Sequence, residues 1–451
     1  MKLVVIGGTA AGLSAASRVR KFLPDADITV VERTGYVSYG SCGLPYFVSG
    51  LIGEPGDLVS FTPEQLAEKR DMKVLMHHEA LSVDPAAKTV EVKNLDTGAV
   101  STLDYDALVI ATGARAAVPA ALRKEADNLF TLRSVEDGIA IRQRAGDMGR
   151  VSVIGGGFIG LEMCEAFVSR GIRTTLYEAQ DRLLPGMPQV FSEAVLKELL
   201  KNGVEVHLST QVDELLVSGG RVTAVRAGET LRETDAVLVC IGVRPNSELA
   251  AAAGAATEPN GAISVDRHQR TTVPGIWACG DCASTFNRVS GERCYAPLGT
   301  NANKQGRVAG ADICGKDVSF PGVLPSQVTK VFDLYCASTG LSEQQAENAG
   351  IPAGSSLITK RDRASYYPGG SDNELCVVFH RETGRVLGAQ GIGGSSVAGR
   401  INALAVAVTA EMTVQELSEL DLVYAPPVAP VYDPILIAGE NAVKAWRKQR
   451  G

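Results

Sequence analysis

Near its start the chain reads LVVIGGTAAG over residues 3–12, a short apolar run that passes directly into a glycine-rich turn. The apolar run predicts a buried strand, and the pattern over residues 13–22 predicts a helix after the turn. A second apolar run over residues 28–32 predicts another strand, which ends at the acidic residue Glu32. Strand, glycine turn, helix and acid-terminated strand together indicate a βαβ unit.

The same plan recurs about 148 positions later. Residues 151–160 read VSVIGGGFIG, a helix is expected over residues 161–170, and the strand over residues 174–178 ends at Glu178. The acid follows the last glycine of the turn by 20 positions in the first copy and by 18 in the second. One glycine motif is weak evidence, but two copies in the full βαβ context predict two Rossmann-like units in an α/β protein.

Each unit is expected to bind a dinucleotide. Glycines let the backbone approach a pyrophosphate, the helix N-terminus offers N–H groups, and the terminal acid accepts a hydrogen bond from a ribose. In the first copy Thr9 stands where the middle glycine is usual. In the second copy Glu178 favours NADH because an acid repels the 2′-phosphate of NADPH, while the nearby Arg182 leaves NADPH open.

Three further apolar runs end in loops that contain glycine. They are residues 107–110 before Ala111-Thr112-Gly113, residues 236–241 before Gly242, and residues 275–281, which end at Gly280 and Asp281. From about residue 321 the pattern of apolar residues changes, and no further nucleotide motif occurs. There the pattern predicts antiparallel strands over 375–379 and 386–391, helices over 402–411, 414–420 and 442–449, and a helix cap at Thr413.

The composition excludes several classes of protein. The 451 residues are 45% hydrophobic and 21% charged, which suits a globular protein with a sizeable core. A formal net charge of −7 lacks the basic excess of a nucleic-acid-binding protein. No run approaches the roughly 18 apolar residues of a membrane helix, so we expect no membrane association. The nine cysteines are scattered and odd in number, which favours a reducing, cytoplasmic setting.

Across its whole length the chain resembles the two-dinucleotide flavoprotein disulfide reductases, because it combines two nucleotide units, glycine-terminated strands and a C-terminal α+β region. The resemblance implies that FAD carries electrons from NAD(P)H to sulfur. It also implies a homodimer with the active site shared between subunits. The implied domains are an FAD-binding domain of residues 1–115 and 247–320, an NAD(P)H-binding domain of residues 116–246, and a C-terminal α+β dimerisation domain of residues 321–451.

The stretch SYGSCGLPY at residues 38–46 indicates the branch of this family. Glutathione-reductase-type members carry two cysteines here, whereas this chain has Cys42 and then Phe47 at the second position. Such members also carry a C-terminal histidine–glutamate pair, and the last histidine here is His380. The chain therefore resembles the single-cysteine branch of coenzyme A-disulfide reductases, NADH oxidases, NADH peroxidases and persulfide reductases. The peroxidases and water-forming oxidases carry a histidine where this chain has Ala10, which argues against peroxide or oxygen as the main substrate.

Coenzyme A-disulfide reductases also carry two functional tyrosines in the third domain. Tyr424 in YAPP matches one of them, and the other is Tyr366 or Tyr367 in YYPG, of which we favour Tyr366. A lysine that the family carries further along is Tyr432 here. The resemblance implies that these phenols come from the partner subunit and hydrogen-bond or protonate a leaving thiolate.

The resemblance also implies the residues that contact ligands. The cofactor contacts are Gly7, Gly8, Ala10, Ala11, Gly12, Glu32, Arg33, Ser41, Ala111, Thr112, Gly113, Gly155, Gly157, Phe158, Ile159, Gly160, Glu162, Glu178, Gly242, Gly280, Asp281, Leu298 and Gly299. The coenzyme A groove is lined by Ser14, Arg18, Lys21, Ser38, Arg70 and Asn303. Arg18, Lys21 and Arg70 are equally consistent with solvated helix charges. We expect no metal site.

We predict that Cys42 is the redox cysteine and that a helical turn over residues 44–51 lowers its pKa. In this hypothesis Cys42 rests as a mixed disulfide with coenzyme A, Glu162 helps to seat the nicotinamide, and a helix that opens within residues 297–302 faces the flavin. Two alternatives stay open. One is an NADH oxidase or peroxidase that uses Cys42 as a sulfenic acid, and the other is a flavoprotein redox sensor without turnover.

Overall fold

The first nucleotide unit is built on a parallel sheet in the order β18-β7-β1-β2-β3. The computed structural model describes residues 1–450. The strands of this sheet are β1 (Lys2–Ile6), β2 (Asp27–Val31), β3 (Lys73–Leu75), β7 (Ala107–Ile110) and β18 (Ile276–Ala278). β1 is buried after its first residue, as expected for a central strand covered on both faces. β18 pairs with β7 although the whole second nucleotide unit separates them in sequence.

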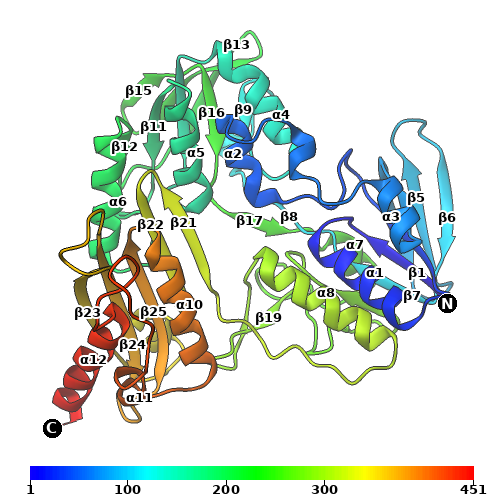
Figure 1. The fold of residues 1–451 in the computed structure, drawn as a ribbon. Helices are drawn as coiled ribbons and strands as arrows, with labels where there is room; N and C mark the ends of the chain where they lie inside the picture. Colours follow the sequence, from blue (N-terminus) through cyan, green and yellow to red (C-terminus); the bar gives the residue numbers. More distant parts are fainter. Residues whose placement is uncertain (451) are drawn as a thin grey trace.

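Two long helices of the first unit lie side by side (Figure 1). Its helices are α1 (Ala10–Phe22), α3 (Pro63–Arg70) and α8 (Gly299–Ile313), whereas α2 (Leu44–Ser49) packs against helices of the second nucleotide unit. Glycines allow α8 to approach α1 closely, because a Cβ at Gly306 would lie 2.1 Å from the carbonyl oxygen of Ala11 and one at Gly310 would lie 2.4 Å from that of Ala15. An antiparallel sheet flanks this unit and consists of β4 (His78–Asp84), β5 (Thr89–Asn94) and β6 (Val100–Asp104).

The second nucleotide unit repeats the plan with the order β12-β11-β10-β16-β9, again parallel. Its strands are β9 (Leu129–Phe130), β10 (Arg150–Ile154), β11 (Arg173–Tyr177), β12 (Glu205–His207) and β16 (Ala236–Val239). Its helices are α4 (Val135–Arg144), α5 (Phe158–Ser169) and α6 (Gln189–Lys201), and its antiparallel sheet is β13 (Glu214–Ser218), β14 (Arg221–Ala227) and β15 (Thr230–Glu233). The antiparallel pair β8 (Ala114–Ala116) and β17 (Val243–Pro245) joins the two units.

The helix of each nucleotide unit begins three residues earlier than the apolar pattern predicts. α1 starts at Ala10 rather than residue 13, and α5 starts at Phe158 rather than residue 161. The first turn of α1 begins with small residues that carry no periodic apolar signal, although alanine is the best helix former. The early start brings each helix N-terminus directly onto the glycine turn.

The C-terminal region forms an antiparallel sheet in the order β21-β22-β25-β24-β23. Its strands are β21 (Gln327–Val331), β22 (Leu334–Gly340), β23 (Ala353–Arg361), β24 (Asp372–His380) and β25 (Val386–Gly393). Side chains alternate between two cores along β24: Leu375 and Val377 pack with the C-terminal helices, whereas Cys376 packs against the second nucleotide unit. One face of this sheet therefore fixes the C-terminal domain on the NAD(P)H-type unit.

The C-terminal helices are α9 (Glu343–Asn348), α10 (Ser396–Thr409), α11 (Val414–Ser418) and α12 (Pro434–Arg450). Of these, α10 and α12 begin earlier and are longer than predicted, α11 is two residues shorter than predicted, and α9 was not predicted. α12 contains Gly439, a weak helix former, but the backbone of Ser418 packs so closely there that a Cβ at Gly439 would lie 2.8 Å from its nitrogen. Thr413 caps α11 as predicted, since its hydroxyl accepts a hydrogen bond from the backbone N–H of Glu416 at 3.3 Å.

The remaining elements are short. They are η1 (Ser41–Gly43), η2 (Pro55–Leu58), η3 (Ala120–Leu122), η4 (Ala145–Asp147), α7 (Glu248–Ala252), β19 (Thr285–Phe286) and β20 (Arg293–Cys294). Within residues 1–450 no helix has both the length and the apolar character needed to cross a membrane. The domain limits at residues 115, 246 and 320 remain predictions.

Candidate active site

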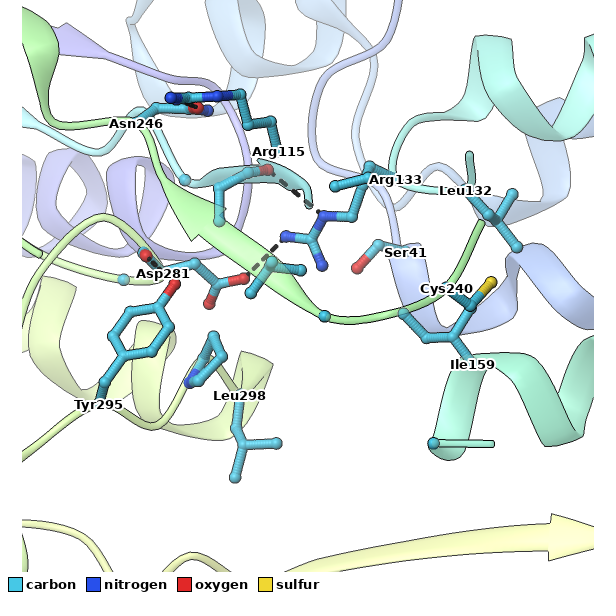
Figure 2. Close-up of a pocket in the computed structure, with 18 of the residues that line it drawn as sticks. Ser41, Arg115, Leu132, Arg133, Ile159, Cys240, Asn246, Asp281, Tyr295 and Leu298 are labelled. Carbon is cyan, nitrogen blue, oxygen red and sulfur yellow. Dashed lines mark hydrogen bonds and ion pairs between the residues drawn. The ribbon is translucent and has the colours of Figure 1, made fainter. Parts of the chain in front are cut away.

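The two glycine turns open on one cavity of about 2090 Å³, part of whose wall is drawn in Figure 2. Pockets for single small molecules measure roughly 300–1,000 Å³. The cavity is therefore large enough for more than one dinucleotide. Its wall includes these predicted cofactor contacts: Gly7, Ala10, Ala11, Glu32, Arg33, Ser41, Ala111, Thr112, Gly113, Gly155, Gly157, Phe158, Ile159, Glu162, Glu178, Gly242, Gly280, Asp281, Leu298 and Gly299.

Three predicted contacts, Gly8, Gly12 and Gly160, lie behind the wall instead. A Cβ at Gly12 would lie 2.0 Å from the carbonyl oxygen of Gly7, and one at Gly160 would lie 1.9 Å from that of Gly155. The last glycine of each motif thus lets the helix start against the turn, which is a packing role rather than a ligand contact. Gly7 and Gly155 have φ of +109° and +112°, a conformation that side chains rarely adopt.

Glu32 at the end of β2 is buried and bound to its own glycine turn. Its Oε2 accepts a hydrogen bond from the N–H of Gly8 at 2.8 Å. Its Oε1 accepts from both the N–H and the hydroxyl of Thr34, each at 2.8 Å. A carboxylate has about four lone-pair positions, so one remains for a ligand hydroxyl in the cavity.

Glu178 at the end of β11 repeats this arrangement with fewer donors and more exposure. Its Oε2 accepts from the N–H of Gly156 at 2.7 Å and its Oε1 from the N–H of Gln180 at 2.8 Å. Arg182, the cation that would suit a 2′-phosphate, instead donates to Asp181 at 3.0 Å. An acid that faces the cavity and an arginine paired elsewhere both favour NADH.

Asp281 forms an ion pair with Arg133, a residue that the sequence analysis did not select (Figure 2). Arg133 Nη2 lies 3.0 Å from the carboxylate of Asp281, and its Nε donates to the carbonyl of Ala114 at 3.3 Å. The hydroxyl of Tyr295 donates to the backbone carbonyl of Asp281 at 2.7 Å. Arg133 thus fixes the carboxylate of Asp281 and Tyr295 fixes its backbone, and no local sequence signal identifies these two partner side chains.

Cys42 lies in η1 on the wall of the cavity that both glycine turns share, and it is exposed. The prediction that a helix N-terminus lowers its pKa is wrong. Although the side chain reaches solvent, its partial desolvation by the surrounding protein, followed by the negative charge of Glu162, raises the pKa of the Cys42 thiol above its usual value. The helix after it, α2, has six residues and ends at Ser49 rather than at residue 51, so its dipole is small.

Glu162 on α5 is close enough for its charge to act on the Cys42 thiol, and a residue of the C-terminal domain hydrogen-bonds to it. The hydroxyl of Thr329 on β21 donates to its Oε1 at 2.9 Å. Burial raises the pKa of Glu162, the Thr329 hydrogen bond opposes that rise, and the charge of Glu165 adds to it. Glu165 in turn pairs with Lys330 and accepts from the N–H of Phe332 at 2.7 Å. Thr329 is a second residue that the sequence analysis missed.

The predicted groove residues lie outside the cavity wall, five of them on α1, α3 and α8 and Ser38 in a loop. Ser14 donates to the side-chain oxygen of Asn303 at 2.7 Å, which joins α1 to α8. Arg18 stacks over Phe22 at 5.5 Å, and Arg70 stacks over Phe61 at 5.6 Å. Lys21 is exposed and Ser38 is partly buried in the loop after β2, with φ of +55°. Lys316, which was not predicted, also lies over Phe22 at 5.4 Å.

The tyrosines lie on the C-terminal domain, away from the cavity wall of the same chain. The hydroxyls of Tyr366 and Tyr424 are 3.3 Å apart, and both side chains are exposed. Tyr367 is the less exposed neighbour, at 38% against 74% for Tyr366. The geometry therefore pairs Tyr366, and not Tyr367, with Tyr424.

Two dinucleotide-type units that share one cavity, with an exposed cysteine on its wall, define a two-cofactor redox enzyme. Among residues 1–450 no cluster of three or more His, Cys, Asp or Glu side chains is placed to hold a metal ion.

Comparison with known proteins identifies the family. Residues 1–306 match the family described as pyridine nucleotide-disulphide oxidoreductase, and residues 326–434 match its dimerisation domain. The chain belongs to this family, and it is therefore an enzyme that uses FAD and NAD(P)H.

Its relatives support the single-cysteine disulfide reductase branch. A protein of Methanocaldococcus jannaschii named NADH oxidase is 36% identical over 98% of this chain and 99% of its own length. The coenzyme A disulfide reductase of Staphylococcus aureus is 30% identical over 98% of this chain and 99% of its own. The structure of an NAD-dependent persulfide reductase from A. fulgidus matches with a TM-score of 0.95 and 40% identity, covering 99% of this chain and 84% of that one.

Proposed function

We propose that this enzyme passes electrons from NAD(P)H through FAD to Cys42, and that it reduces a low-molecular-weight disulfide or persulfide. A coenzyme A disulfide is the substrate we favour. The observation that carries the proposal is the placement of Cys42. Of the nine cysteines, all within the described residues, Cys42 is the exposed one, and it lines the cavity that both glycine turns share.

Both dinucleotides fit the residues present. The first turn with Glu32, Asp281 and the N-terminus of α8 would hold FAD, and the second turn with Glu178 would hold the nicotinamide cofactor. FAD supplies two-electron transfer between the nicotinamide and sulfur when it is bound. Glu162, fixed by Thr329, would help to seat the nicotinamide.

Cys42 acts in this proposal without a second protein thiol. It first holds one substrate thiol as a mixed disulfide, and two electrons break that S–S bond to leave a Cys42 thiolate and a released thiol. The Cys42 thiolate then attacks the next disulfide, forms a new mixed disulfide and expels the second thiol. The balance is one disulfide, one NAD(P)H and one proton in, and two thiols and NAD(P)⁺ out.

The two phenols would serve the leaving thiol. Because the two hydroxyls are 3.3 Å apart, one can donate a hydrogen bond to the leaving thiolate while it accepts a hydrogen bond from the other. The hydrogen bond between the two hydroxyls raises the pKa of Tyr366, and a phenol, whose ordinary pKa is about 10, is protonated at neutral pH and can donate. Since both lie away from the cavity wall of their own chain, we propose that they act on Cys42 of a second subunit.

Coenzyme A carries several phosphates, so its groove needs cations. Arg18 and Lys316 over Phe22, together with exposed Lys21, place positive charge along α1 and the end of α8. Aromatic rings beside these cations also suit a nucleotide base. These features support an anionic, nucleotide-containing thiol over a small uncharged one.

An NADH oxidase is the second candidate, because the relative from Methanocaldococcus jannaschii carries that name. In that reaction Cys42 would cycle through a sulfenic acid. Ala10, at the position where the water-forming oxidases carry a histidine, lines the cavity and offers no proton donor.

Steady-state turnover with the purified flavoprotein tests the proposal. We expect Cys42→Ser to lose NADH-dependent reduction of coenzyme A disulfide by about 10³-fold or more, as for loss of a nucleophile, while reduction of an artificial dye persists. Cys314→Ser, at a half-exposed thiol outside the cavity, is the matched control and should retain full activity. Full disulfide turnover by Cys42→Ser, or oxygen consumption faster than disulfide reduction, would contradict the proposal.

A further inference from the structure

The paired tyrosines sit on two loops that are distant in sequence. Tyr366 lies between β23 and β24, and Tyr424 lies between α11 and α12. The side chains of Tyr366 and Tyr424 are 74% and 47% exposed, so packing alone does little to fix their positions. The loops touch through a backbone contact, in which the N–H of Ala364 lies 3.4 Å from the carbonyl of Pro426.

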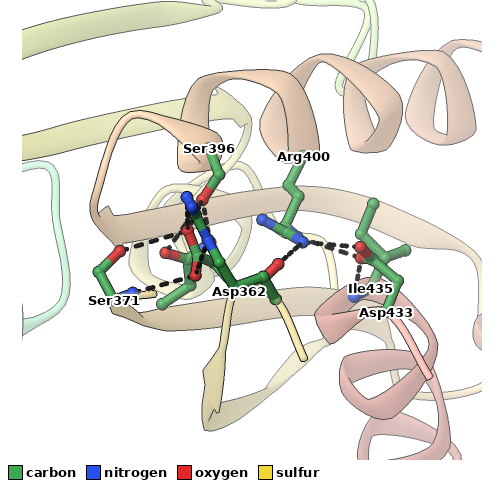
Figure 3. A network of polar contacts seen from close by, with 8 residues as sticks. Asp362, Ser371, Ser396, Arg400, Asp433 and Ile435 are labelled. Carbon is green, nitrogen blue, oxygen red and sulfur yellow. Dashed lines mark hydrogen bonds and ion pairs between the residues drawn. The ribbon is translucent and has the colours of Figure 1, made fainter. Parts of the chain in front are cut away.

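A buried polar network lies beneath both loops (Figure 3). Its centre is Arg400 on α10, which is 6% exposed. Arg400 Nε and Nη2 donate to the two carboxylate oxygens of Asp433 at 3.1 and 2.8 Å. The same Nη2 donates to the backbone carbonyl of Asp362 at 2.8 Å. Asp362 begins the first tyrosine loop and Asp433 ends the second, so one guanidinium joins both loops at their bases.

Each aspartate also closes its own loop. Asp362 Oδ1 accepts from the N–H of Ser371 at 3.0 Å, which joins the two ends of the Tyr366 loop, and its Oδ2 accepts from the hydroxyl of Ser396 at 3.2 Å. Asp433 Oδ1 accepts from the N–H of Ile435 at 2.9 Å and so fixes the start of α12. The network is therefore connected from one loop, through α10, to the other loop.

A buried ion pair of this kind contributes little net stability, because desolvation offsets most of the attraction. What it supplies is geometry. The planar fork of arginine fixes two partners at once, which a lysine with one charged nitrogen does not reproduce. Asp362, Arg400 and Asp433 are all buried beneath the two exposed loops. Their contacts can therefore hold the two loops in one arrangement.

We propose that Arg400 is a positioning residue for the Tyr366–Tyr424 pair, acting through Asp433 and the backbone of Asp362. The inference rests on the proposed role of the phenols in disulfide reduction. Arg400 touches neither phenol; it sets the distance between them by joining the bases of their loops.

A double-mutant cycle in the full-length flavoprotein tests this. We expect Arg400→Met to lower kcat for coenzyme A disulfide about tenfold, as a misplaced catalytic group does, with FAD content and NADH-to-dye turnover unchanged. Arg400→Lys should recover part of the loss. In a Tyr366→Phe, Tyr424→Phe background Arg400→Met should cause little further loss, because residues that act through one another are not additive.

The outcomes separate the two levels of the proposal. Full disulfide turnover by the tyrosine double variant contradicts the proposed role of the phenols, and the positioning role with it, whereas lack of disulfide turnover in the unmodified enzyme contradicts the proposed function itself. If that variant is impaired but Arg400→Met is not, or if the losses multiply, only the positioning role fails. Equal losses of dye and disulfide reduction would mark Arg400 as merely structural. Asp433→Asn, which keeps an acceptor for Ile435, repeats the test should Arg400→Met not fold, and Arg381→Met removes an exposed ion pair with Glu347 of the same domain as control.

Discussion

The two nucleotide units share one motif, but they differ in how the protein surrounds the acid at the end of the second strand and in what packs against the motif helix. Glu32 is 7% exposed and accepts three hydrogen bonds, whereas Glu178 is more exposed and accepts two. Helix α1 of the first unit is packed on α8 through Gly306 and Gly310. Helix α5 of the second unit instead presents acids to the C-terminal domain.

This difference teaches how one motif serves two kinds of ligand. In the proposed function, a buried acid with three hydrogen bonds to the protein suits a cofactor that stays bound, and a more exposed acid with two suits one that must leave after each turnover. The link from α5 to β21 also joins the second nucleotide unit to the domain that carries the tyrosines. The following predictions test whether the two units are as unequal as the contacts indicate.

The largest effect is expected at the first glycine of each motif. Ala in place of Gly7 or Gly155 would meet a carbonyl oxygen at 2.1 or 2.5 Å and is strained at φ near +110°. A cost of about 3 kcal/mol or more is expected from strain and overpacking. Gly7→Ala should lose FAD and unfold at lower temperature, whereas Gly155→Ala should keep FAD and raise the KM for NADH. FAD content by absorbance checks this, and equal loss of FAD in both variants would contradict the comparison.

Glu178→Ala should change which nicotinamide cofactor is used. Removal of a charged acceptor costs about 1.5–3 kcal/mol, so kcat/KM for NADH should fall about tenfold or more. The value for NADPH should fall less, because the acid no longer repels a 2′-phosphate. Glu233→Gln, at an exposed residue paired with Arg150, is the control. An unchanged ratio of the two cofactors would show that Glu178 does not face the ribose.

Thr329→Val should cause a several-fold loss in kcat/KM for NADH, because it removes one hydrogen bond of roughly 1 kcal/mol to Glu162. The hydrogen bond opposes the burial that raises the pKa of Glu162, so its loss raises that pKa further. Activity that needs the ionised carboxylate should then fall away at a higher pH as the solution is acidified. Thr359→Val, exposed on β23, should leave the pH profile unchanged. An unmoved acid limb in Thr329→Val would contradict the link between α5 and β21.

The smallest effect concerns the thiol itself. After removal of any bound thiol, alkylation of Cys42 should rise with pH and reach half its maximum above the usual thiol range, since its pKa is raised. Glu162→Gln removes a negative charge that disfavours the thiolate, so its curve should lie at lower pH than that of the unmodified protein. Cys164, fully buried, serves as the internal control and should not react. Coinciding curves would show that Glu162 and Cys42 are not coupled.

The parts of the fold that local patterns encode were predictable. Both βαβ units, the antiparallel strands of the C-terminal domain and the Thr413 cap follow from apolar spacing, glycines and capping residues. The candidate site was predictable where the motif itself lies on the wall, as with Gly7, Glu32 and Asp281.

The remainder depends on contacts between distant segments. Arg133, Thr329 and Arg400 matter through partners more than 30 positions away, and nothing beside them in sequence marks those partners. The pKa of Cys42 was predicted in the wrong direction for the same reason. The local helix is visible in sequence, whereas the burial and the charge of Glu162 that outweigh it come from tertiary structure.

The central claim is that Cys42 works with a sulfur borrowed from its substrate rather than with a second protein thiol. Mass spectrometry of the purified enzyme, denatured without reductant, tests it most directly. We predict a coenzyme A adduct on the Cys42 peptide that disappears after incubation with NADH. A Cys42 peptide joined to another cysteine of the chain, or one that carries only a sulfenic acid, would contradict the claim.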